Sequence, residues 1–80
     1  MQLFVRPLDL PTIVIEVESS DTIDKVKEMI EKRTKIPRSY QHLITGSQCL
    51  YNGKTLEQYH IDQGITLNVV FRLLSSNMNT

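Results

Sequence analysis

The chain has 80 residues, a length that suits one small domain. Apolar residues make up 40% and charged residues 22% of the sequence, an ordinary composition for a globular domain. Nine basic and nine acidic residues give a net charge of zero, and this balance argues against nucleic acid or an anionic membrane as a partner.

Alternation of apolar and other residues predicts two strands within residues 1–17. The apolar positions are Met1, Leu3 and Val5 in the first run, and Ile13, Ile15 and Val17 in the second. The segment Pro7–Pro11 between the runs predicts a hairpin turn. Its two prolines should keep the turn from extending the strand ladder, because proline has no N–H to donate.

A helical spacing of apolar residues replaces the alternation after residue 22. The residues with this spacing are Ile23, Val26, Met29 and Ile30. Thr22 is suited to the N-cap position of the predicted helix. The pair Ile36-Pro37 should end it, because proline biases the preceding residue towards extended geometry.

The second half of the chain predicts short strands at 41–45 and 48–50, joined by a tight turn at Gly46-Ser47. A short helical turn should follow between Leu56 and Ile61, and Thr66–Leu73 should form the last strand. The predicted fold class is therefore α+β, with one mixed, curled sheet of about five strands packed on one helix.

Five segments between Met1 and Leu73 resemble ubiquitin, and the likeness needs no gap. They are Met1-Gln2-Leu3-Phe4-Val5, Ser20-Asp21-Thr22-Ile23, Ile36-Pro37, Gly53-Lys54-Thr55-Leu56 and Val70-Phe71-Arg72-Leu73. The resemblance implies a ubiquitin-like β-grasp domain over residues 1–74. Residues 75–80 are then expected to be a polar tail and the start of a linker.

The outward face of the predicted sheet should carry apolar side chains. If Leu67 and Val69 point into the core, Asn68, Val70 and Arg72 point out; if Leu43 points in, His42 and Ile44 point out. In ubiquitin the positions of Leu8, Ile44 and Val70 form the main binding patch. The resemblance thus implies a protein-binding surface, here called the Ile44 face, made of Leu8, His42, Ile44, Ser47, Gln48, Asn68, Val70 and Arg72. The alternative is a set of scattered surface apolar residues, which small proteins commonly have.

Some residues around this face differ from those of ubiquitin. His42 replaces an arginine, Asn68 a histidine and Ser47 a glycine, so partners that depend on the arginine should bind less well. Leu10 replaces a glycine in the hairpin loop. Since a positive φ would be unfavourable for leucine, we expect a different loop conformation, and an apolar loop could extend the face.

Two further surfaces follow from the resemblance. Phe4 and Val14 are a candidate secondary interaction surface, or a cross-strand pair that only stabilises the hairpin. Ile36, Phe71 and Leu73 are a possible third cluster, or a partly buried sheet edge.

Catalytic, cofactor and metal sites are not expected. Cys49, the only cysteine, cannot form a disulfide within the chain and has no cation at a spacing that would activate it. His42 and His60 lack the clustered Cys, Asp or Glu residues that a metal site would require. The sequence has no glycine-rich phosphate loop, paired catalytic carboxylates or nucleophile motif, so we do not expect an enzyme. No apolar run is long enough for a signal peptide or a membrane span, so we expect a cytoplasmic or nuclear protein.

The resulting prediction is a monomeric, non-conjugated interaction domain, the N-terminal module of a larger protein. Its expected partners are ubiquitin-binding helical domains, proteasomal ubiquitin receptors or another segment of the parent protein. A conjugated modifier is an alternative, but ubiquitin ends in Arg-Gly-Gly where this sequence has Leu74, Ser75 and Ser76. A sulfur-carrier protein would need the same glycines. A decoy that occupies ubiquitin receptors would use the same surface as the interaction domain.

Overall fold

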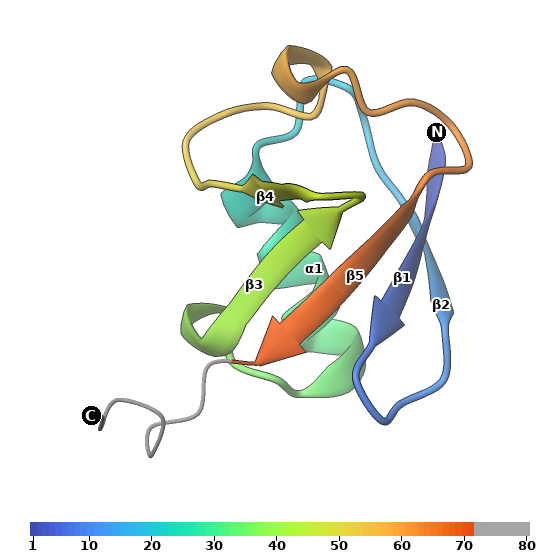
Figure 1. Cartoon of the computed structure of the whole chain (residues 1–80), viewed down its shortest axis with the longest axis vertical. Coiled ribbons are helices and arrows are strands. Elements are labelled where there is room, and N and C mark those ends of the chain that lie inside the picture. Colours follow the sequence, from blue (N-terminus) through green and yellow to red (C-terminus); the bar gives the residue numbers. More distant parts are fainter. Residues whose placement is uncertain (72–80) are drawn as a thin grey trace.

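Five strands form one mixed sheet in the computed structural model, which describes residues 1–71 and, for Phe71, the backbone only. The strands are β1 (Gln2–Pro7), β2 (Ile13–Glu16), β3 (Gln41–Thr45), β4 (Gln48–Leu50) and β5 (Thr66–Phe71). Their order is β2-β1-β5-β3-β4 (Figure 1). β1 and β5 are parallel, and the other neighbours are antiparallel.

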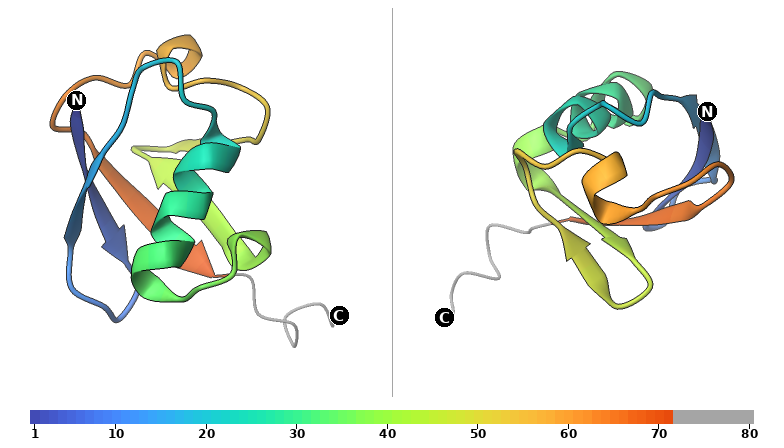
Figure 2. Two further views of the ribbon diagram at one scale, coloured as in Figure 1. Left: turned by 180° about the vertical axis from the view of Figure 1, so that it is seen from behind. Right: turned by 90° about the horizontal axis from the view of Figure 1, so that it is seen from above.

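One α-helix, α1 (Ile23–Thr34), covers one side of the sheet, and the sheet curls around it (Figure 2). Two 3-10 turns, η1 (Arg38–Tyr40) and η2 (Glu57–Tyr59), lie in the connections. The other side of the sheet has no helix over it among the described residues. The predicted α+β architecture is therefore confirmed.

The ends of α1 follow from local chemistry. The Thr22 side chain accepts a hydrogen bond from the Lys25 N–H at 3.2 Å, which confirms the predicted N-cap. Lys35 ends the helix in the left-handed conformation with φ 69°, and its N–H donates to the Glu31 carbonyl at 2.7 Å. The pair Ile36-Pro37 then continues in a non-helical conformation, as expected.

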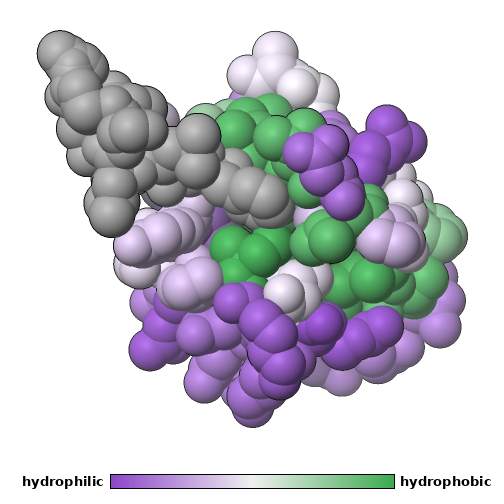
Figure 3. Space-filling view, turned by 90° about the horizontal axis from the view of Figure 1, so that it is seen from below, coloured by the Kyte–Doolittle hydropathy of each residue, from purple (hydrophilic) through white to green (hydrophobic). Residues whose placement is uncertain are grey.

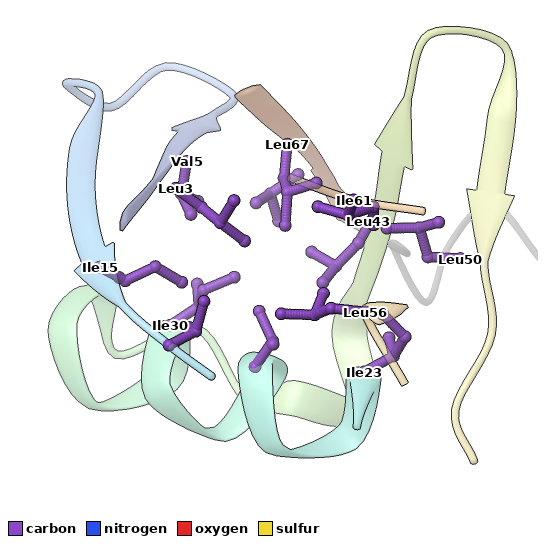
Figure 4. Close-up of a cluster of buried hydrophobic side chains, with 13 residues drawn as sticks. Leu3, Val5, Ile15, Ile23, Ile30, Leu43, Leu50, Leu56, Ile61 and Leu67 are labelled. Carbon is purple, nitrogen blue, oxygen red and sulfur yellow. The ribbon is translucent and has the colours of Figure 1, made fainter. Parts of the chain in front are cut away.

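The core lies between α1 and the sheet and holds 13 buried hydrophobic side chains (Figure 4). They are Leu3, Val5, Ile15, Val17, Ile23, Val26, Ile30, Leu43, Leu50, Leu56, Ile61, Leu67 and Val69. Met1, Ile13 and Met29, predicted from the same patterns, are only partly buried and pack against this cluster. The sequence pattern therefore identified the core, but the residues at the edge of the core are less buried than the pattern suggests.

The hairpin between β1 and β2 differs from the prediction. Pro7 is buried and belongs to β1, where it lies opposite Val69 of β5, so the turn begins at Leu8. The Pro7 carbonyl accepts a hydrogen bond from the Leu10 N–H at 3.4 Å. Asp9 adopts the positive φ of this loop, 64°, so Leu10 does not need it.

One further strand end differs, and another is not tested by the described residues. β2 ends at Glu16, although the Val17 N–H still bonds the Met1 carbonyl at 2.8 Å. β5 reaches Phe71 in the described part of the chain, so the predicted end at Leu73 lies outside it. The expected domain boundary at residue 74 lies outside it as well.

Candidate protein-binding surface

A row of four residues crosses the sheet on the side away from α1. Strand register places Asn68 of β5 between Arg6 of β1 and Ile44 of β3, and Cys49 of β4 lies opposite Ile44. Ile44, Asn68 and Cys49 are half-buried and Arg6 is exposed. Ile44 thus lies between polar Asn68 on one side and Cys49 on the other.

The next outward pair along β5 is Val70 opposite His42. Val70 is 43% exposed, whereas Val69, the preceding residue, is buried in the core. The predicted alternation is thereby confirmed for the described residues of β5. His42 is half-buried beside Val70.

A shallow groove of about 480 Å³ separates the β1–β2 loop from β5. Its lining is formed by Arg6, Pro7, Leu8, Asp9, Leu10, Pro11, Thr12, Asn68, Val69 and Val70. Leu8 is 56% exposed and shares this groove with Asn68 and Val70. The loop therefore keeps Leu8 next to Asn68 and Val70 of the Ile44 face. It also adds exposed Leu10 and Pro11 to the lining of the groove.

The groove lies at the end of the molecule that carries the β1–β2 loop. Figure 3 views this end and shows a band of hydrophobic residues crossing it, bordered by hydrophilic residues. The charges in the groove are those of Arg6 and Asp9. An apolar floor with one cation and one anion suits an amphipathic protein segment better than a highly charged ligand.

Not all predicted members of the Ile44 face gather at its centre. Ser47 and Gln48 are exposed at the turn between β3 and β4. Gln48 lies opposite Thr45, one residue before Cys49, so its side chain alternates away from the Ile44 row. Ser47 is therefore at the border of the face, Gln48 is directed away from it, contrary to the prediction, and Arg72 lies outside the described residues.

The secondary surface lies on the same side of the sheet. Phe4 and Val14 are directly paired across β1 and β2, and both are exposed. Phe4 is two residues before Arg6 on the same strand, so this pair adjoins the row through Ile44. For the possible third cluster, Ile36 is half-buried after α1, while the Phe71 side chain and Leu73 are outside the described residues.

Two residues of this surface were missed at the sequence level. Arg6 and Cys49 have the same strand alternation as Phe4 and Ile44, and this signal could have placed them on the outward side. Leu10 and Pro11 line the groove because of the loop conformation, which alternation does not determine.

Within residues 1–71 there is no group of three or more His, Cys, Asp or Glu side chains that could hold a metal ion. None of the helices in this part of the chain has the length and apolar character needed to cross a membrane.

The family model described as "Ubiquitin family" matches residues 3–74. The chain belongs to the ubiquitin family. The five-stranded sheet packed on one helix is accordingly the ubiquitin-like β-grasp fold.

This ubiquitin-family domain is similar both to short proteins and to parts of longer ones. It is 33% identical over 73 residues to the NEDD8-like protein RUB3 of Arabidopsis thaliana, a match that covers 91% of this chain and 94% of RUB3. It is 38% identical over 77 residues to the E3 ubiquitin-protein ligase UPL5 of the same plant, covering 95% of this chain and 9% of UPL5. It is 33% identical over 72 residues to ubiquitin-like protein 4A of Xenopus tropicalis, covering 90% of this chain and 49% of that protein. A ubiquitin-like domain is therefore shared with all three, while the ligase activity named for UPL5 belongs to a protein that is mostly outside the match.

Proposed function

We propose that this chain is a non-conjugated ubiquitin-like interaction domain that docks helical ubiquitin-binding modules on the Ile44 face. The proposal is supported by the outward positions of Ile44 and Val70 on neighbouring strands, and by exposed Leu8, which lines one groove with Val70. Exposed aliphatic side chains grouped beside a groove are more typical of a binding site than of an inert surface.

The shape of the surface suits an amphipathic helix. Ile44 and Val70 lie on neighbouring strands, and Leu8 borders the groove next to Val70. A helix could place apolar residues spaced by three and four positions against these points. Such a small contact should give a dissociation constant of about 1 μM or weaker, near −8 kcal/mol or less in magnitude.

The sequence after the last strand supports the non-conjugated state. Ser75 and Ser76 stand where ubiquitin has its terminal glycines. Conjugation requires a terminus thin enough to reach the nucleotide of an activating enzyme, and two serine side chains hinder this passage. The resemblance to a segment of UPL5 also supports a module within a longer protein.

The decisive experiment is an amide chemical-shift titration of the isotope-labelled domain with a ubiquitin-associated helical domain. We expect saturable shifts centred on Leu8, Ile44 and Val70, and their loss in Ile44→Ala. A proteasomal receptor helix is the second ligand to test. An unchanged affinity of the Ile44→Ala variant for every such ligand would reject the Ile44 face.

Two valines of similar exposure provide a matched control. Val70 is 43% exposed within the Ile44 face, and Val14 is 41% exposed outside it. Val70→Ala should weaken binding about fivefold or more, while Val14→Ala should leave it nearly unchanged. A larger effect at Val14 would assign the binding to the secondary surface with Phe4.

A conjugated modifier is the second candidate, favoured by the match to 94% of RUB3. Incubation with ubiquitin-type activating enzymes and ATP distinguishes the two, because only a modifier forms the thioester. A decoy would use the Ile44 face as well, and an affinity above that of ubiquitin for a shared receptor would identify it.

A further inference from the structure

A basic segment lies at the end of α1 and the start of η1, on the side of the molecule opposite to the Ile44 face. No acidic residue occurs between Glu31 and Glu57, and four cations lie in the first part of this interval. They are Lys32, Arg33, Lys35 and Arg38, and all four are exposed. The neutral net charge of the chain therefore conceals a local positive excess.

Three of these cations line one hollow. A shallow groove of about 410 Å³ is formed by Glu28, Glu31, Lys32, Lys35 and Arg38. Arg33 is not part of it, because its Nη1 atom donates a hydrogen bond to the Val14 carbonyl at 3.0 Å. Figure 3 shows hydrophilic residues along the lower border of the molecule, which is the side of α1 in that view.

The position of Lys35 indicates more than helix stabilisation. Cations in the last turn of a helix compensate its dipole, and Lys32 and Arg33 can have this role. Lys35 follows the last turn with φ 69°, a conformation in which glycine is preferred because a Cβ atom is unfavourable. Arg38 lies in η1, outside the helix. Helix stability alone would therefore favour glycine at position 35 and requires no cation at position 38.

We propose that this groove, formed by Glu28, Glu31, Lys32, Lys35 and Arg38 and here called the α1 groove, binds an acidic peptide segment of a partner protein. Carboxylates of the peptide would pair with Lys32, Lys35 and Arg38. Glu28 and Glu31 lie one helical turn before Lys32 and Lys35, so a basic residue at one end of the peptide would fix its direction.

The two carboxylates in the groove favour a peptide over a nucleic acid. A continuous polyanion would place phosphates against Glu28 and Glu31, whereas a peptide can change the sign of its charge along its length. The proposal goes beyond docking at the Ile44 face, because most of the α1 groove is lined by α1, and α1 covers the side of the sheet away from that face (Figure 2).

The test measures fluorescence anisotropy with a short fluorescein-labelled peptide that is rich in glutamate and has a lysine at one end. In a chemical-shift titration of the isotope-labelled domain with the same peptide, binding at low ionic strength should move the amide signals of Lys32, Lys35 and Arg38. Lys32→Gln and Arg38→Gln should each weaken it about threefold. Lys25→Gln, which removes the same charge from an exposed position on the same helix outside the groove, is the matched control and should have little effect.

Lys35→Gly separates recognition from stability. Glycine fits the left-handed position, so the melting temperature of this variant should equal or exceed that of the parent chain, while peptide affinity falls. The same peptide with glutamine in place of glutamate, and single-stranded oligothymidine, are the ligand controls. Absence of binding at low salt, an equal loss in Lys25→Gln, or equal affinity for oligothymidine would each overturn the proposal.

Discussion

At the residue scale, burial alternates along β5 and should separate stability from recognition. Leu67 is fully buried, and Leu67→Ala should lower the free energy of unfolding by about 2–5 kcal/mol, because it leaves a cavity in the core. Val70→Ala should lower it by less than about 1 kcal/mol, since this side chain is already partly in water. Urea denaturation of both variants checks the two values, and similar losses would contradict the assigned faces.

Individual residues also show where sequence reasoning stops. The side-chain directions of Ile44, Asn68 and Val70 could be predicted, because alternation along a strand is a fixed property of the backbone. The conformations of Asp9 and Lys35 could not, because a positive φ at a non-glycine residue depends on the packing around it. The groove beside Leu8 depends on the first of these conformations.

At the element scale, the N-cap of α1 is the contact with the clearest single-residue test. Thr22→Ala should lower the free energy of unfolding by about 1 kcal/mol, because the Lys25 N–H loses its side-chain acceptor. Thr22→Ser keeps a hydroxyl and should remain close to the parent chain. Thermal or urea unfolding of the two variants checks this, and equal losses would show that the hydroxyl group is not the cause.

The elements themselves were largely predictable. β3 and β4 begin and end where the sequence pattern placed them, because a Gly-Ser turn separates two clear apolar runs. The end of β1 could not be predicted, because proline is expected to lie outside a strand and not within it. Pro7 is accommodated there because it is the last residue of the strand, where a missing N–H removes little of the ladder.

At the scale of the whole molecule, two candidate surfaces lie on opposite sides of one sheet and should act independently. Ile44→Ala should leave the affinity of the acidic peptide unchanged, and Lys35→Gly should leave the affinity of the helical module unchanged. In the double variant, the free energy of binding of each ligand should change by the same amount as in the single variant of its own surface, within about 0.5 kcal/mol. Titration of each ligand in the presence of the other checks this, and a strong mutual effect would show that the surfaces are coupled.

The binding surfaces illustrate the same division between pattern and tertiary structure. The Ile44 face was found from alternation and family resemblance, since each of its central residues lies on a regular strand. The α1 groove was not, because it joins the end of a helix to the following turn, and no periodicity connects Lys32 with Arg38. Charge along the sequence showed only that cations were numerous there.

The strand order has a consequence for synthesis of the chain. β5 is the last of the described strands to be made, yet it lies in the middle of the sheet and is the only one of them that joins β1 to β3. On a translating ribosome, the β1–β2 and β3–β4 hairpins therefore stay unjoined until residue 71 has emerged. During that interval the apolar side of α1 and the unpaired edges of both hairpins are open to other nascent chains, and chaperones that shield such edges should bind the domain then.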